Sequence, residues 1–260
     1  SRTVIAQMVT QLKRYGARAV GFDIVFSEAD ENAALKGWTQ LSRELGSLGI
    51  TDRRLLQWVH SKKRAADTDA ILAKSIENAD NVTLDYFFHT SKRDAEHISP
   101  EDIAQGEKRI ANSRYPMVQM RHEPDPYNML YAYAAVPSLQ ILTDVAVNSG
   151  YFNAFPDPDG VIRWAPLVMK QGEHYYYPMA LAVLLQYLGL PPLRLVLNEV
   201  GVESIYLEDV RIPVDESGRL LINYLGPAKT FPHYSVTDII NGRLSPDLFK
   251  DRIVIVGATA

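Results

Sequence analysis

Acidic side chains at the end of a predicted buried strand are the first groups in this sequence that could bind a ligand. Residues 17–26 form an apolar run that Asp23 interrupts, and Glu28 and Asp30 follow in the next loop. A buried carboxylate must accept hydrogen bonds or meet a cation, because burial without a partner is costly. The carboxyl ends of strands border the ligand crevice in open α/β sheets. We therefore predict Asp23 and Glu28 as ligand-binding residues, although acidic loop ends also occur for solubility alone.

A second group of candidate residues surrounds a predicted turn. Asp159 precedes Gly160 in that turn, and Arg163 follows four positions after Asp159. The guanidinium of Arg163 could pair with Asp159 or clamp an anionic ligand. Asn223 and Tyr224 are further candidate ligand-binding residues. In the structural alternative Asp159 forms the turn, Arg163 pairs locally, and the Asn-Tyr pair satisfies backbone groups.

The sequence carries no recognisable signature of an enzyme or of a metal site. The sequence holds no Gly-x-Ser-x-Gly elbow, no phosphate-binding loop and no glycine-rich dinucleotide fingerprint. Cysteine is absent, and the six histidines lack the spacing of metal ligands. The acids between Asp23 and Asp30 could offer oxygen ligands to Ca²⁺ or Mg²⁺, but an Asp-x-Asp-x-Asp-Gly loop is missing. The sequence therefore predicts no catalytic residue, no metal site and no cofactor.

Composition and charge limit the class of protein. At 260 residues and 47% hydrophobic residues, the chain suits one large domain or two small ones. A net charge of -4 and a pI of about 5.9 give no electrostatic reason to expect nucleic acid or an anionic membrane surface as a partner. No apolar run approaches the ~20 residues that a membrane helix requires. The absence of cysteine fits a cytosolic or an extracytoplasmic location.

Alternating helix and strand patterns predict an α/β fold, with a mixed central sheet, flanking helices and an antiparallel strand-rich C-terminal part. Residues 253–256 are fully apolar, so we expect a central, parallel strand covered on both faces. Residues 150–155 and 161–168 flank Asp159-Gly160 and are predicted to pair as a hairpin. The other predicted elements are helices over 5–15, 67–76, 99–111, 178–188 and 235–242, and strands over 17–26, 82–88, 194–197, 204–207, 210–213 and 220–224.

Two stretches, residues 31–66 and 89–135, lack the regular pattern of the rest. The first is predicted to be helical but broken near Gly46 and Gly49, with basic clusters around apolar side chains in its second half. Such a segment is either an ordinary solvated face or a surface for lipid or a partner. Prolines and charges in the second stretch argue against continuous strand. We predict one domain over residues 1–260, with insertions at these two places.

Five phrases along the chain carry a resemblance to a known family. They are Gly16-Ala-Arg-Ala-Val-Gly-Phe-Asp-Ile-Val-Phe26, Gly150-Tyr-Phe-Asn153 with Asp157-Pro-Asp-Gly-Val-Ile-Arg163, Ile222-Asn-Tyr-Leu-Gly226, Tyr234-Ser-Val-Thr-Asp-Ile-Ile-Asn-Gly242 and Lys250-Asp-Arg-Ile-Val-Ile-Val-Gly-Ala-Thr259. Together they resemble the CHASE type-two family, the extracytoplasmic sensory domains of bacterial membrane receptors. The similarity covers about residues 4–30, 67–88 and 144–260.

The resemblance implies a receptor architecture. It implies a membrane helix before the sensor and several after it, followed by a cytoplasmic adenylate/guanylate cyclase or, alternatively, a serine/threonine or histidine kinase. The chain would then be the periplasmic portion of a bacterial inner-membrane protein, homodimeric in the full-length receptor, with a small-molecule ligand. The abrupt end after residues 253–256 predicts a piece cut from a longer protein. Residues 1 and 260 are expected to lie close together on the side that faces the bilayer.

Three functions remain open from the sequence. The first is a ligand sensor without catalytic activity, which can shift an output only through its differential affinity for two arrangements. The second is a dimerisation and spacer module, which needs a large self-complementary surface. The third is an enzyme built around Asp23 and neighbouring acids.

Overall fold

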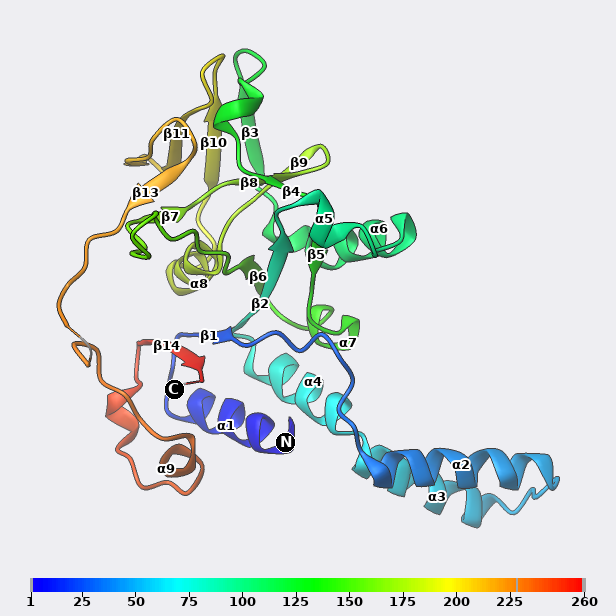
Figure 1. Ribbon diagram of the computed structural model, residues 1–260. Helices are drawn as coiled ribbons and strands as arrows, with labels where there is room; N and C mark the ends of the chain where they lie inside the picture. The colour runs from blue at the N-terminus through cyan, green and yellow to red at the C-terminus, as the bar shows by residue number, and fades with distance from the viewer. Residues whose placement is uncertain (1, 228, 259–260) are drawn as a thin grey trace.

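A mostly parallel sheet lies at the centre of the computed structural model, which describes residues 2–227 and 229–258 (Figure 1). Its four parallel strands lie in the order β14 (Ile253–Gly257), β1 (Ala19–Asp23), β2 (Val82–His89) and β6 (Asn148–Tyr151). The fifth strand, β5 (Ala134–Val136), pairs antiparallel with the end of β2. The predicted mixed central sheet is confirmed.

Helices cover the two faces of this sheet. On one face lie α1 (Arg2–Arg14), α4 (Thr68–Ala79), α7 (Gln140–Thr143) and α9 (Val236–Ile240), which share a core with β1 and β2. The apolar side chains of α1 recur at helical spacing, so that Met8, Val9 and Leu12 are all buried against that core. On the other face, α8 (Met179–Leu188) contacts the sheet at its glycines. Among the described residues, no helix is both long and apolar enough to cross a bilayer.

The C-terminal half adds three small sheets, most of whose pairings are antiparallel, as predicted. Buried side chains of α8, among them Leu181 and Leu185, pack into the core of these sheets, so α8 lies between them and the central sheet. The strands are β12 (Val210–Ile212), β11 (Val202–Leu207), β10 (Leu193–Leu197) and β3 (Met117–Met120) in one sheet, β4 (Tyr131–Ala132), β8 (Met169–Gln171) and β9 (His174–Tyr176) in the second, and β13 (Arg219–Leu221) with β7 (Trp164–Pro166) in the third.

The two predicted insertions differ in how they join this body. Within residues 31–66, α2 (Ala33–Ser47) and α3 (Arg53–Ala66) form a helical hairpin that extends away from the sheets (Figure 1). Residues 89–135 instead supply β3, β4 and β5 to three different sheets, together with α5 (Lys92–Ala95), α6 (Pro100–Arg109) and the short helices η1 (Ala111–Ser113) and η2 (Pro126–Asn128). Whether either stretch is an insertion stays a prediction.

The predicted hairpin at Asp159-Gly160 is wrong. A turn is present there, because the N–H of Gly160 donates to the carbonyl of Asp157 at 2.8 Å. The two flanking strands do not pair with each other, since β6 pairs with β2 and β7 pairs with β13. All four residues of β6 are buried where the strand joins the central sheet beside β2, which a two-stranded ribbon could not provide.

The prediction that the last strand is central and covered on both faces is also wrong. β14 is an edge strand that pairs with β1 alone among the described strands. Val254 and Val256 pack against the core under α1, but Ile253 and Ile255 on the opposite face are 41% and 53% exposed. An apolar run reports a preference for burial, whereas the neighbours of a strand are set by long-range pairing.

Candidate functional site

Two aspartates lie side by side in the central sheet, Asp23 at the carboxyl end of β1 and Asp85 in the middle of β2. The parallel register pairs Gly21 with Thr83, and its continuation by two residues places Asp23 opposite Asp85. Adjacent strands are ~4.8 Å apart, so the two carboxyl groups are neighbours. Both side chains point to the face that α8 covers, because side chains alternate along a strand and Phe22, between Gly21 and Asp23, lies in the core on the other face.

Two glycines flank this pair of acids. Gly257 on β14 pairs with Asp23, and Gly150 on β6 pairs with Asp85. A Cβ added at Gly150 would lie 2.4 Å from the backbone nitrogen of Met179, so the first turn of α8 rests directly on Gly150. We call the four aligned residues Gly257, Asp23, Asp85 and Gly150 the aspartate row.

Asp85 is buried without a hydrogen-bond partner. The residue is 1% exposed, and among the described residues neither carboxylate oxygen has a partner. Burial first, and the neighbouring charge of Asp23 second, raise the pKa of the Asp85 carboxyl from 3.8 to about 9. Thr83, two positions earlier on the same face, is also fully buried with an unpartnered hydroxyl. Because buried polar groups are nearly always paired in native proteins, these oxygens need a partner that the described side chains do not supply, such as a buried water or a ligand.

The strand order reverses at β1, the strand that ends in Asp23. From β1 the sheet continues through β2 to β6 on one side, whereas β14 lies on the other side. In open α/β sheets, ligands bind outside the carboxyl ends of the strands at such a reversal. Asp23, the last residue of β1, is exposed, and no hydrogen bond of the described residues reaches its carboxylate. Asp23 therefore forms the open end of the row and Asp85 its buried part.

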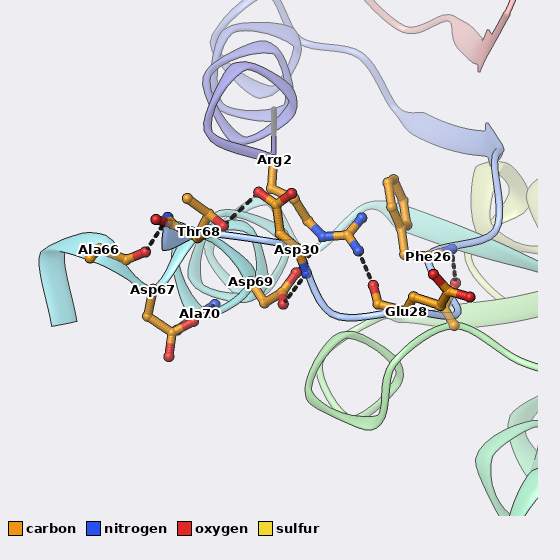
Figure 2. Close-up of polar contacts among 11 residues, drawn as sticks. Arg2, Phe26, Glu28, Asp30, Ala66, Asp67, Thr68, Asp69 and Ala70 are labelled. Atoms are coloured by element: carbon orange, nitrogen blue, oxygen red, sulfur yellow. Dashed lines mark hydrogen bonds and ion pairs between the residues drawn. The ribbon is translucent and has the colours of Figure 1, made fainter. Parts of the chain in front are cut away.

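Glu28 lies apart from the row, in the loop after β1. Contacts of Arg2 and Asp69 hold this loop against α1 and α4. The predicted strand over residues 17–26 ends at Asp23, and the following loop places the Glu28 carbonyl where the Arg2 guanidinium donates to it (Figure 2). Arg2 also pairs with Asp69 at the start of α4. The second oxygen of the Asp69 carboxylate accepts from the N–H of Asp30 at 3.0 Å. The Glu28 side chain itself is exposed and takes no part in these contacts. Its role as a ligand-binding residue therefore stays a prediction.

The predicted ion pair between Asp159 and Arg163 is present. The two guanidinium nitrogens of Arg163 lie 2.9 and 2.7 Å from the two carboxylate oxygens of Asp159, and Nη1 also lies 2.8 Å from Asp157. Hydrogen bonds from Arg163 and from the Val161 N–H hold the pKa of the Asp159 carboxyl below its ordinary value. Because two carboxylates already engage this guanidinium, the local pairing is favoured over a clamp for an anionic ligand.

Tyr224 and Asn223 lie next to this turn. The Tyr224 hydroxyl donates to the carbonyl of Ile162, which brings it beside Arg163. Both residues line an open groove of about 770 Å³ formed by residues 222–227, 229–231 and 233. Tyr224 is 64% exposed, so the groove presents an aromatic ring without enclosing it. Their role in ligand binding stays a prediction.

The structure thus brings some of the predicted residues together, leaves Glu28 apart from the others, and adds one residue. Asp159, Arg163 and Tyr224 lie together, whereas Asp23 belongs to the aspartate row. Asp85, which is buried and adjacent to Asp23, was not among the predicted residues. A signal was available, because Asp85 interrupts the apolar run Val82–Phe88 as Asp23 interrupts residues 17–26.

The chain was compared with known proteins. A family model described as the CHASE2 domain matches residues 1–260. Comparisons with curated proteins and with solved structures found no match.

Proposed function

Because the chain belongs to the CHASE2 domain family, an extracellular sensory domain family found in signalling receptors, we propose that it senses a small molecule at the aspartate row. The family is sensory and non-catalytic, so this chain is not an enzyme. In our proposal it is the periplasmic portion of a bacterial inner-membrane receptor and regulates a cytoplasmic adenylate/guanylate cyclase. A serine/threonine or histidine kinase is the alternative output.

The unpartnered carboxyl group of Asp85 is the observation that carries the ligand site. Leaving a buried polar group unpaired costs ~1–3 kcal/mol, and more for a charged group. A ligand that supplies hydrogen-bond donors or a positive charge to Asp85 removes this cost only while it is bound. Such a ligand stabilises one state of the domain, which is the physical requirement for a sensor.

The first described residues and the last described strand both lie next to β1 or the loop that follows it. Arg2 lies against the ring of Phe26, with its guanidinium carbon 4.8 Å from the ring centroid, and Gly257 pairs with Asp23. The Arg2 side chain thus contacts the loop after β1, and the last described strand pairs with β1 itself. The expectation for residues 1 and 260 themselves lies outside the described residues.

A screen of metabolites by thermal shift tests the proposed function. We expect at least one compound to raise the Tm of the domain in a concentration-dependent way, because a ligand that binds only the folded state stabilises it by ~2.7 kcal/mol at one hundred times its Kd. The same compound should leave the Tm of an Asp85→Asn variant unchanged and should still stabilise Asp209→Asn, which alters an exposed aspartate in the β11–β12 turn. A broad screen without any hit would argue for a spacer without a ligand.

A dimerisation module is a second candidate function, and the edge strand β14 favours it. Its outer edge is unpaired among the described strands, and Ile253 and Ile255 are exposed beside it. Apolar edge strands are places where a second chain can add to a sheet. If β14 joins two copies, sedimentation will show a dimer, and Ile255→Lys will convert it to a monomer. A wild-type chain that stays monomeric at high concentration would rule this function out.

A further inference from the structure

The hairpin of α2 and α3 lies outside the aspartate row and buries few of its own side chains. None of the described side chains of α2 is fully buried, and of those of α3 only Val59 is. The two helices meet through the rings of Trp38 and Trp58, whose centroids are 5.3 Å apart. At the base, the Asn32 side chain donates to the Ala66 carbonyl at 2.7 Å. Two helices alone do not enclose a core, so the remaining apolar side chains of the hairpin face its surroundings.

Positive charge is concentrated in α3. Five of the 27 Lys and Arg of the chain lie in this helix, and none of the 31 Asp and Glu does, so α3 carries +5 and the rest of the chain -9. No described acid forms an ion pair with these five side chains, which are Arg53, Arg54, Lys62, Lys63 and Arg64. The net charge of -4 thus conceals a strongly basic helix, for which an anionic surface is an electrostatically favoured partner.

Large apolar side chains lie exposed beside these charges. Leu48, at the tip of the hairpin, is 73% exposed, and Ile50 follows it in the same loop. Leu55 and Trp58 are exposed on α3, between its two basic clusters, and Trp58 is 50% exposed. Helices that lie in a membrane interface combine Trp and Leu with Lys and Arg in this way. The amphipathic ring of tryptophan suits the boundary between headgroups and acyl chains.

We propose that the α2–α3 hairpin binds the anionic lipid surface of the bilayer, with the basic side chains of α3 at the phosphate groups and Leu48, Ile50 and Trp58 at the interface. This inference rests on the proposed function, which attaches the domain to a membrane. In the proposed receptor a membrane helix precedes α1. Arg2, in the first turn of α1, pairs with Asp69 at the start of α4, directly after α3, so the base of the hairpin lies at that end of the domain (Figure 2).

A second copy of the chain is the other negatively charged partner to consider. Its acidic loops after β3 and between β10 and β11 hold Glu123, Asp125 and Glu199, and the Asp125 N–H donates to the Glu199 carbonyl at 3.0 Å. These loops lie at the end of the domain opposite to the hairpin (Figure 1). Two receptors in one membrane have the same orientation, so α3 of one copy does not meet the acidic loops of the other. The arrangement favours lipid as the partner.

Flotation of the purified chain with lipid vesicles tests the proposal. We expect binding to vesicles that contain phosphatidylglycerol but not to vesicles of phosphatidylcholine alone, and release at high salt, because salt screens exposed charges. Arg53→Glu combined with Arg54→Glu should lower the affinity roughly tenfold or more, since each Lys or Arg near an anionic surface strengthens binding about fivefold. Glutamate is favourable in the first turn of a helix, so this variant should stay folded, which circular dichroism checks. Lys13→Glu combined with Arg14→Glu, an exposed basic pair in the last turn of α1, is the matched control and should bind as the wild type does.

Tryptophan fluorescence reports the insertion of the hairpin. Two of the three tryptophans, Trp38 and Trp58, lie in it, and Trp164→Phe removes the third. The emission of the Trp164→Phe variant should shift to shorter wavelength with phosphatidylglycerol vesicles, because the exposed ring of Trp58 leaves water. Leu48→Asp should weaken both this shift and the flotation.

Lack of binding to phosphatidylglycerol vesicles would overturn the proposal, and so would binding that the Arg53 and Arg54 double variant retains in full. A chain that ignores vesicles but forms dimers, which the same variant dissociates, would assign α3 to a second copy. The metabolite screen, run without vesicles, keeps this proposal separate from the proposed function. A compound that stabilises the wild type and the α3 variant alike would preserve sensing without lipid contact, whereas vesicle binding without any metabolite hit would preserve the lipid surface and leave sensing unsupported.

Discussion

Asp85→Asn is expected to raise the free energy of unfolding at pH 7 by up to about 4 kcal/mol. The folded state holds the pKa of Asp85 at about 9, whereas the ordinary value is 3.8. The unfolded chain therefore releases this proton at neutral pH and the folded chain does not, which favours unfolding. Asparagine has no proton to lose, and its amide is no worse partnered than the neutral carboxyl group.

The sign of the pH dependence follows from the raised pKa. The stability contributed by protonated Asp85 is complete below about pH 4 and is lost progressively as the pH rises toward about 9. Urea unfolding at pH 4.5, 7 and 9 should thus show a decline in the wild type that is much weaker in Asp85→Asn. Asp209→Asn should follow the wild type. Equal pH dependence in wild type and Asp85→Asn would show that the carboxyl group has a partner in solution.

Gly150→Ala is expected to destabilise the domain by about 3 kcal/mol or more, at the upper end of overpacking costs. The added Cβ would lie 2.4 to 2.6 Å from three backbone atoms of Pro178 and Met179. Backbone atoms at the start of a helix cannot rotate away as a side chain can, so α8 must shift as a whole. α8 packs against both the central sheet and the C-terminal sheets, and its displacement therefore weakens two cores at once.

Gly37→Ala is the matched control for this substitution. Gly37 lies in the middle of α2, and an added Cβ there would meet nothing within 4 Å. Alanine in an exposed helix interior is more stable than glycine by ~0.5–1 kcal/mol, so this variant should gain stability. Guanidinium unfolding of both variants measures the contrast. A Gly150→Ala protein as stable as the wild type would contradict the tight seating of α8 on β6.

The local elements of this protein follow from its sequence because their causes are local. The apolar run after Pro178 predicts α8, and the helix spans Met179–Leu188 and ends at Gly189 in the left-handed conformation. The ion pair of Asp159 and Arg163 was predictable for the same reason, since a turn brings residues four apart into contact. The family resemblance was also carried by short phrases of sequence, and a family model that matches residues 1–260 confirms it.

Strand order and the aspartate row, in contrast, were decided by tertiary structure. Asp23 and Asp85 are 62 positions apart, and nothing local in either strand indicates that β1 and β2 pair, or in which register. The sequence gives β14 the same apolar character as a central strand, yet the chain places it at the edge. The hydrophobic pattern of a strand indicates which of its side chains prefer burial, because the free energy of moving a side chain from water into the core depends mainly on that side chain. Which strands become neighbours depends on the packing of the whole chain, and in this protein that packing brings two acids together without a counter-charge.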